Sequence, residues 1–183
     1  MRANDLYVED VASGNITRLT TDGSATIVNG TSDWVYEEEF GVRDGFRWSP
    51  DSRSIAFWRF DTSGVPVFTM INNTDATYPR LVQFKYPKAG ETNPAVRVGV
   101  VPVSGGYPVW MKAPGDPRDT YIPRLEWAGN PGQVVFQHLN RLQNTLTVFI
   151  GDAATGALKR VAHVRINGVY GEAMQWMPDQ KTL

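Results

Sequence analysis

The most constraining feature of this sequence is a strand–turn–strand pattern that occurs three times. Each copy places a tryptophan in a first short strand, passes through a turn rich in Pro, Asp or Gly, and leads into a second strand. The copies lie at residues 46–57, 125–136 and 174–183. A strand pair that recurs in this way is typical of a β-propeller, because each blade repeats the same four-stranded sheet.

A second strand–turn–strand pattern, with glycine in its turn, alternates with the first. Its copies lie at residues 6–19, 100–110 and 146–161. One copy of each pattern together supplies four strands joined by tight turns, which is the content of one blade. No segment sustains for long the i, i+3, i+4, i+7 spacing of an amphipathic helix, so the sequence predicts an all-β chain.

The spacing of the tryptophans gives the size of the repeat. Trp127 and Trp176 are 49 residues apart, which fits a propeller blade of roughly 40–50 residues. Trp48 and Trp127 are 79 residues apart, so this blade is expected to contain an insertion of about 30 residues. We place the insertion at about 61–93.

We therefore predict an all-β fold: an incomplete β-propeller with about two full four-stranded blades and two partial blades. The predicted units are a half-blade at 4–29, a short helix at 30–41, a blade at 42–113 with an inserted arm at about 61–93, a blade at 124–165 and the start of the next blade at 166–183. A closed propeller needs at least four blades, so we expect the chain to come from a longer protein. A small free-standing β-domain that resembles blades by chance is the alternative.

Composition excludes several classes of function. The chain has 18 Lys and Arg against 19 Asp and Glu, so it lacks the basic surface of a nucleic-acid-binding protein. It has no cysteine, which excludes disulfides, cysteine-ligated zinc and a thiol nucleophile. No stretch approaches the ~18 apolar residues of a membrane span, and no signal peptide precedes the first strand. If the parent protein is exported, we expect its signal upstream of this chain.

Residues 30–41 interrupt the repeat with a segment typical of a short helix. Ser32 or Asp33 can cap its start, and Gly41 can end it. Between them lie three aromatic side chains and three consecutive carboxylates. The aromatic residues are Trp34, Tyr36 and Phe40, and the carboxylates belong to Glu37, Glu38 and Glu39. The plainest interpretation is a solvated acidic turn that its aromatic side chains hold in place.

A cation site is the functional interpretation of the same segment. Two carboxylates aimed into one cavity repel each other unless a cation lies between them. The α-ammonium of a peptide has a pKa of about 7.7–8 and three N–H donors, so two carboxylates can each accept one. A metal ion is the rival, but consecutive helical residues point in different directions and no His or Asp cluster is nearby. We expect neither a metal nor a cofactor.

Four segments, taken in order, resemble the dipeptidyl peptidase IV family of prolyl oligopeptidase-type serine peptidases. They are Asp-Trp-Val-Tyr-Glu-Glu-Glu at 33–39, Trp-Ser-Pro at 48–50, Tyr-Pro-Lys-Ala-Gly-Glu-Thr-Asn-Pro at 86–94, and Leu-Asn-Arg-Leu-Gln-Asn at 139–144. The first resembles the double-glutamate motif that this family carries on a short propeller helix. The resemblance covers most of residues 4–165, and the first and third segments together are highly specific.

The resemblance implies a peptidase outside the cytosol (periplasmic, secreted or at the cell surface) that removes X-Pro or X-Ala dipeptides from peptide N-termini. The family's eight-bladed propeller caps an α/β-hydrolase domain, which is the expected partner of this chain. Within the motif, Glu38 and Glu39 would bind the ammonium of a peptide substrate with a free N-terminus, and Glu37 would be structural. The blade insertion at about 61–93 would be the arm that helps the family build a homodimer.

The catalytic machinery of such a peptidase is not in this sequence. It contains no Gly-x-Ser-x-Gly elbow, and His138 and His163 lie in strand-like contexts with no Ser–Asp arrangement around them. No segment before Gly30 matches the family's carbonyl-binding arginine, and residues 166–172 depart from its better-known members. We therefore expect the chain alone to be inactive. A non-catalytic propeller that serves as a scaffold for protein interactions is the alternative function.

Overall fold

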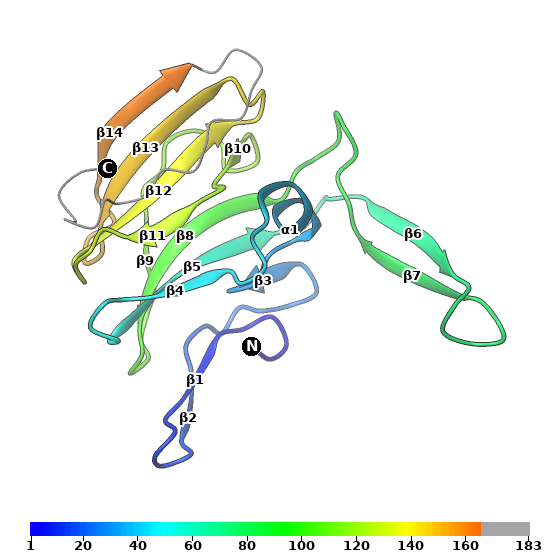
Figure 1. Cartoon of the computed structure of the whole chain (residues 1–183), viewed down its shortest axis with the longest axis horizontal. Coiled ribbons are helices and arrows are strands. Elements are labelled where there is room, and N and C mark those ends of the chain that lie inside the picture. The colour runs from blue at the N-terminus through cyan, green and yellow to red at the C-terminus, as the bar shows by residue number, and fades with distance from the viewer. Residues whose placement is uncertain (166–183) are drawn as a thin grey trace.

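The structure is a computed structural model that describes residues 1–165, and within them the chain forms four antiparallel sheets and one short helix (Figure 1). Two of these are five-stranded sheets that lie one beside the other, and the two others are isolated hairpins. The sheets do not close into a ring. The predicted all-β fold, an incomplete β-propeller, is confirmed.

The first blade is built around β5, which pairs on one side with two short strands and on the other with β8. Its strands are β3 (Ile27–Asn29), β4 (Phe46–Trp48), β5 (Ser54–Asp61), β8 (Ala95–Pro102) and β9 (Val109–Trp110). β3 and β4 pair with successive parts of β5, so together they occupy the place of a single inner strand. Helix α1 (Trp34–Phe40) lies between them in sequence.

The second blade repeats this plan. Its strands are β10 (Thr120–Tyr121), β11 (Leu125–Trp127), β12 (Gln133–Asn140), β13 (Thr145–Asp152) and β14 (Leu158–Arg165). β10 and β11 again share one side of the long strand β12. Trp48 pairs with Ile55 in the first blade and Trp127 pairs with Val134 in the second, so the tryptophan pattern marks the same register in both.

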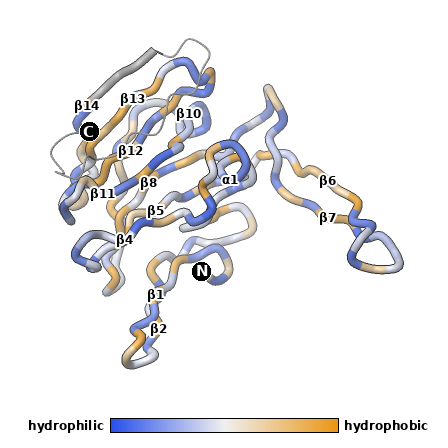
Figure 2. The backbone as a smooth tube through the Cα atoms, in the orientation of Figure 1, coloured by the Kyte–Doolittle hydropathy of each residue, from blue (hydrophilic) through white to orange (hydrophobic). Residues whose placement is uncertain are grey.

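Two hairpins complete the described chain. β1 (Tyr7–Glu9) pairs with β2 (Ile16–Arg18) near the N-terminus, and β6 (Val67–Asn72) pairs with β7 (Arg80–Lys85). The second hairpin projects away from the blades, and we call residues 61–93 the arm (Figure 1). Hydrophobic residues occur on both of its strands even though it stands apart from the blades (Figure 2).

The main hydrophobic core lies between the two blades and includes residues from both. Trp58 and Phe136 are fully buried in it. The indole N–H of Trp58 donates to the carbonyl of Ile122 at 2.8 Å, and that of Trp127 donates to the carbonyl of Arg47 at 3.0 Å. Each tryptophan therefore contributes apolar area to the core and satisfies its polar atom on the neighbouring blade.

One boundary differs from the prediction. Residues 27–29 fall within the predicted half-blade at 4–29, but as β3 they pair with β5 of the following blade. The predicted start of a further blade at 166–183 lies outside the described residues. In the part of the chain that is described, no helix is long and apolar enough to cross a membrane.

Candidate functional site

Helix α1 lies in an excursion, residues 31–44, from what is otherwise one continuous inner strand. Gly30 N donates to the Trp58 carbonyl at 2.9 Å, and Trp58 N donates to the Gly45 carbonyl at 3.0 Å. The two ends also meet each other, since Gly45 N donates to the Gly30 carbonyl at 3.2 Å. A Cβ at Gly45 would lie 2.6 Å from the carbonyl oxygen of Thr31, so this closure requires glycine.

The ends of α1 follow the capping rules that the sequence predicted. Asp33 is the N-cap, and its side chain accepts a hydrogen bond from Tyr36 N at 3.0 Å. Gly41 ends the helix in the left-handed conformation, at φ 65°. Burial raises the pKa of the Asp33 carboxyl to about 6, because desolvation outweighs the hydrogen bonds that favour its charged form.

Two aromatic side chains fix α1 to both blades. Tyr36 and Phe40 are buried, and the Tyr36 ring lies 4.7 Å from the Phe60 ring, measured between centroids. The Tyr36 hydroxyl accepts a hydrogen bond from Ile122 N at 2.8 Å. Arg124 donates from Nη1 to the carbonyl of Phe40 at 2.6 Å. The helix backbone is therefore held by the second blade as well as by the first, which leaves its other face free to present side chains.

The three glutamates follow one another along the exposed part of the helix. Glu37, Glu38 and Glu39 are all exposed. Among the described residues, no Lys, Arg or His forms an ion pair with any of them. The three glutamates predicted from the sequence are thus adjacent carboxylates on a fixed helix. No cation of the described residues pairs with them, so they can bind a cation of a ligand.

Glu38 and Glu39 line two hollows that adjoin each other. Trp34 of α1 and Tyr86 of the arm line both hollows, and their ring centroids are 4.2 Å apart. The arm hollow, of about 560 Å³, is lined by Glu38 together with Trp34, Phe68, Met70, Phe84, Tyr86, Lys88 and Ala89. The blade hollow, of about 400 Å³, has Glu39, Phe40, Asn93, Tyr121 and Arg141 among its lining residues and shares Trp34, Tyr86, Lys88 and Ala89 with the arm hollow.

Comparison with known proteins decides the family. The sequence matches the family model described as the dipeptidyl peptidase IV (DPP IV) N-terminal region over residues 1–181. The chain belongs to the dipeptidyl peptidase IV family.

Relatives in the dipeptidyl peptidase IV family align with most of the chain. It is 38% identical to the inactive dipeptidyl peptidase 10 of Rattus norvegicus over 162 residues, which are 86% of the chain and 20% of that protein. It is 36% identical to the probable dipeptidyl peptidase 4 of Aspergillus clavatus over 171 residues, 88% of the chain and 22% of that protein. The crystal structure of Porphyromonas gingivalis dipeptidyl peptidase 4 superposes with a TM-score of 0.82 at 35% identity, covering 92% of the chain and 24% of that structure.

The chain thus spans about a fifth to a quarter of the length of the dipeptidyl peptidases that it matches.

Within the described residues, no group of three or more His, Asp or Glu side chains could hold a metal ion. The two histidines lie in strands: His138 is in β12 and His163 is in β14. Burial lowers the pKa of His138, which favours its neutral form.

A link between the arm and the second blade could not be read from the sequence. Arg118 donates to the carbonyl of Asp61 at 3.2 Å and to the carbonyl of Asn93 at 2.9 Å, so one guanidinium holds both ends of the arm. It also reaches the Asp61 carboxylate at 3.3 Å. The loop sequence Asp-Pro-Arg-Asp at 116–119 predicts a turn, but nothing in it points to residues 57 and 25 positions away.

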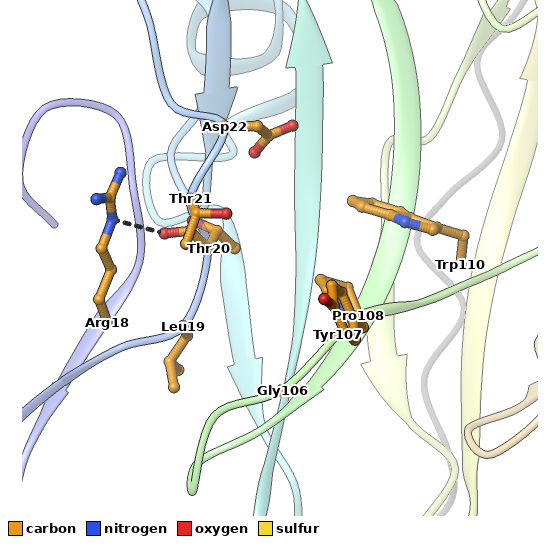
Figure 3. A pocket seen from close by; sticks show the side chains of 9 residues that line it. All are labelled: Arg18, Leu19, Thr20, Thr21, Asp22, Gly106, Tyr107, Pro108 and Trp110. Carbon is orange, nitrogen blue, oxygen red and sulfur yellow. Dashed lines mark hydrogen bonds between the residues drawn. The ribbon is translucent and has the colours of Figure 1, made fainter.

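A further hollow lies between the segment that begins at the end of β2 and the segment that leads into β9, and no residue of α1 lines it (Figure 3). Its volume is about 410 Å³, and Asp22, Tyr107 and Trp110 are among the residues that line it. The Asp22 carboxylate pairs with Arg59 at 2.8 Å, and the guanidiniums of Arg59 and Arg97 lie 5.9 and 4.9 Å from the Trp110 ring centroid. The carboxylate that lines this hollow, that of Asp22, is thus already paired with a cation, unlike the carboxylates of α1.

Proposed function

We propose that this chain is the part of a dipeptidyl peptidase IV-like serine exopeptidase that holds the free N-terminus of the substrate. The observation that carries the proposal is the pair of adjacent, exposed and unpaired carboxylates of Glu38 and Glu39 on a helix that both blades fix in place. The complete enzyme would release X-Pro or X-Ala dipeptides. Glu37, in the first turn of α1, has a structural role in this proposal.

The chemistry of a free N-terminus suits this arrangement. Its α-ammonium offers three N–H donors and a positive charge, and each charge-assisted hydrogen bond to a carboxylate contributes about 1.5–3 kcal/mol. An acylated N-terminus or an internal peptide bond offers a neutral amide instead, which does not offset the desolvation of two carboxylates. The positive charge of a free N-terminus therefore explains why the site would select it. A dipeptide would be released because the site holds the substrate ammonium at a fixed distance from the peptide bond that is cut.

The catalytic groups of the proposed peptidase belong to an α/β-hydrolase domain in the rest of the protein. The sequence has no Gly-x-Ser-x-Gly elbow, so the nucleophile must come from outside this chain. We place the parent protein outside the cytosol, in the periplasm, in the medium or at the cell surface, because of its likeness to this family.

We further propose a homodimer through the arm. Ile71 and Leu81 pair with each other across the hairpin, and their side chains are 62% and 67% exposed.

A non-catalytic propeller is the second candidate function, and one relative favours it. The rat protein that is 38% identical over 86% of the chain is described as an inactive dipeptidyl peptidase. In this candidate function the propeller would serve as a scaffold for other proteins. The proposed N-terminus site can be tested in an active peptidase and in an inactive propeller alike, because binding of a dipeptide to the site does not require catalysis.

The test is to replace each glutamate in the complete protein. Glu38→Gln and Glu39→Gln should each lower kcat/KM for a dipeptidyl-proline chromogenic substrate by about 30- to 1000-fold, because each removes a charged partner of the ammonium. Glu37→Gln is the matched control and should change kcat/KM by less than about threefold. Equal losses at all three positions, or none at Glu38 and Glu39, would refute the proposal.

A further inference from the structure

The unpaired carboxylates of α1 have a cationic neighbour on the arm. Lys88 lines both the arm hollow, with Glu38, and the blade hollow, with Glu39. It lies in the segment that returns from the arm to the first blade, where Glu91 N donates to the Lys88 carbonyl at 2.9 Å. No other Lys, Arg or His of the described residues lines both hollows.

The surroundings of Lys88 hold its ammonium without neutralising it. The Lys88 Nζ lies 5.5 Å from the centroid of the Phe68 ring, in cation–π geometry. No carboxylate of the described residues forms an ion pair with it. Arg141 lines the blade hollow but not the arm hollow, and its charge is already paired. It donates to the carbonyl of Glu91 and lies 3.7 Å from the Asp119 carboxylate.

We infer that Lys88 is a built-in competitor for the substrate ammonium and so sets the affinity of the N-terminus site. The inference rests on the proposed function of Glu38 and Glu39. A lysine head group and a peptide N-terminus are both primary ammonium ions, so carboxylates that attract one also attract the other. The lysine stem is long and flexible, which lets its head group move between the Phe68 ring and the carboxylates.

Two consequences follow from this competition. In the free protein, the positive charge of Lys88 lowers the repulsion between the carboxylates of Glu38 and Glu39. When a substrate arrives, its ammonium must compete with the Lys88 ammonium for the same two carboxylates. Lys88 thus weakens the binding of every N-terminus by about the same factor.

The decisive variant is Lys88→Met in the complete protein, because methionine keeps an unbranched side chain and removes the charge. The KM for glycyl-prolyl-p-nitroanilide should fall about two- to fivefold with kcat unchanged, and the inhibition constant of the dipeptide Gly-Pro should fall by the same factor. Lys88→Arg keeps the charge and should stay near the wild-type KM. Lys112→Met, at an exposed lysine that lines neither hollow, is the matched control for a lost surface charge.

The outcomes separate this inference from the function on which it rests. If Glu38→Gln raises KM but Lys88→Met leaves it unchanged or raises it, the role of Lys88 is wrong and the N-terminus site stands. If Glu38→Gln and Glu39→Gln have no effect, the site itself is wrong. In a Glu38→Gln, Glu39→Gln background, Lys88→Met should no longer lower KM, and a persistent fall would overturn the inference. If the parent protein lacks activity, the Kd of Gly-Pro by calorimetry replaces KM in each comparison.

Discussion

The first blade contains two insertions, and they are built in opposite ways. The helical excursion at 31–44 returns to the strand that it left and buries Tyr36 and Phe40 in the core between the blades. The arm at 61–93 leaves the body and exposes apolar residues on its hairpin, where Met70 is 50% exposed. The first insertion is fixed by contacts within the chain, whereas the second has apolar surface left over.

The difference indicates what each insertion is for. A rigid backbone with charged side chains on its free face suits a site that must recognise a small group at one position. An exposed apolar hairpin suits contact with another protein surface. The two insertions meet at Trp34 and Tyr86, so the proposed recognition helix and the proposed interaction arm share one boundary.

The largest effect should come from the excursion. Tyr36→Ala removes a fully buried ring and the hydrogen bond to Ile122 N, so we expect a loss of about 3–5 kcal/mol in stability. Hydrogen exchange in peptides from residues 31–44 of the complete protein should show the loss as faster exchange. Leu81→Ala on the arm is the contrast and should cost less than about 0.5 kcal/mol. Similar losses for the two variants would contradict the distinction drawn between the insertions.

The arm should respond in association rather than in stability. Ile71→Asp combined with Leu81→Asp places two like charges directly opposite each other on the exposed hairpin. If the complete protein is a dimer through the arm, its dissociation constant should rise at least about 100-fold, because both apolar contacts are lost. Sedimentation or light scattering over a range of concentrations measures this. A dimer that survives both charges would show that the interface lies elsewhere.

A smaller effect should come from the cap of α1. The pKa of Asp33 is about 6 in the folded protein and about 3.8 when unfolded, so the folded state retains this proton between about pH 4 and 6 while the unfolded state releases it. Stability therefore falls as pH rises through this window. An asparagine side chain at this position would cap the helix without ionising. Asp33→Asn should thus be more stable by about 1–2 kcal/mol at pH 7.5 and close to wild type at pH 4. An advantage independent of pH would contradict the buried-carboxyl account.

Local features of the site could be predicted from the sequence. The tryptophan pattern located the paired strands. Ser32 or Asp33 was predicted to begin α1 and Gly41 to end it, because capping depends on residues a few positions apart, and the structure has Asp33 as the N-cap. The excess spacing between Trp48 and Trp127 predicted an insertion of about 30 residues, and the hairpin of β6 and β7 lies inside the range 61–93 that we assigned to it. The assignment of Glu38 and Glu39 to an ammonium ion stays a prediction.

Contacts between distant segments could not be predicted. The strand at Ile27–Asn29 was placed in the preceding half-blade because nothing nearby shows that it continues across the excursion into β4. The hydrogen bond from Ile122 N to the Tyr36 hydroxyl joins residues 86 positions apart, and Arg118 reaches Asp61 across 57 positions. Lys88 was part of a family-like segment, but its place beside α1 depends on how the arm folds back.

The most direct test of the account is a crystal structure of the complete protein with a bound X-Pro dipeptide. The α-ammonium nitrogen should lie about 2.7–3.2 Å from a carboxylate oxygen of Glu38 and from one of Glu39, with Glu37 turned away from it. A dipeptide whose ammonium contacts neither Glu38 nor Glu39 would contradict the central claim.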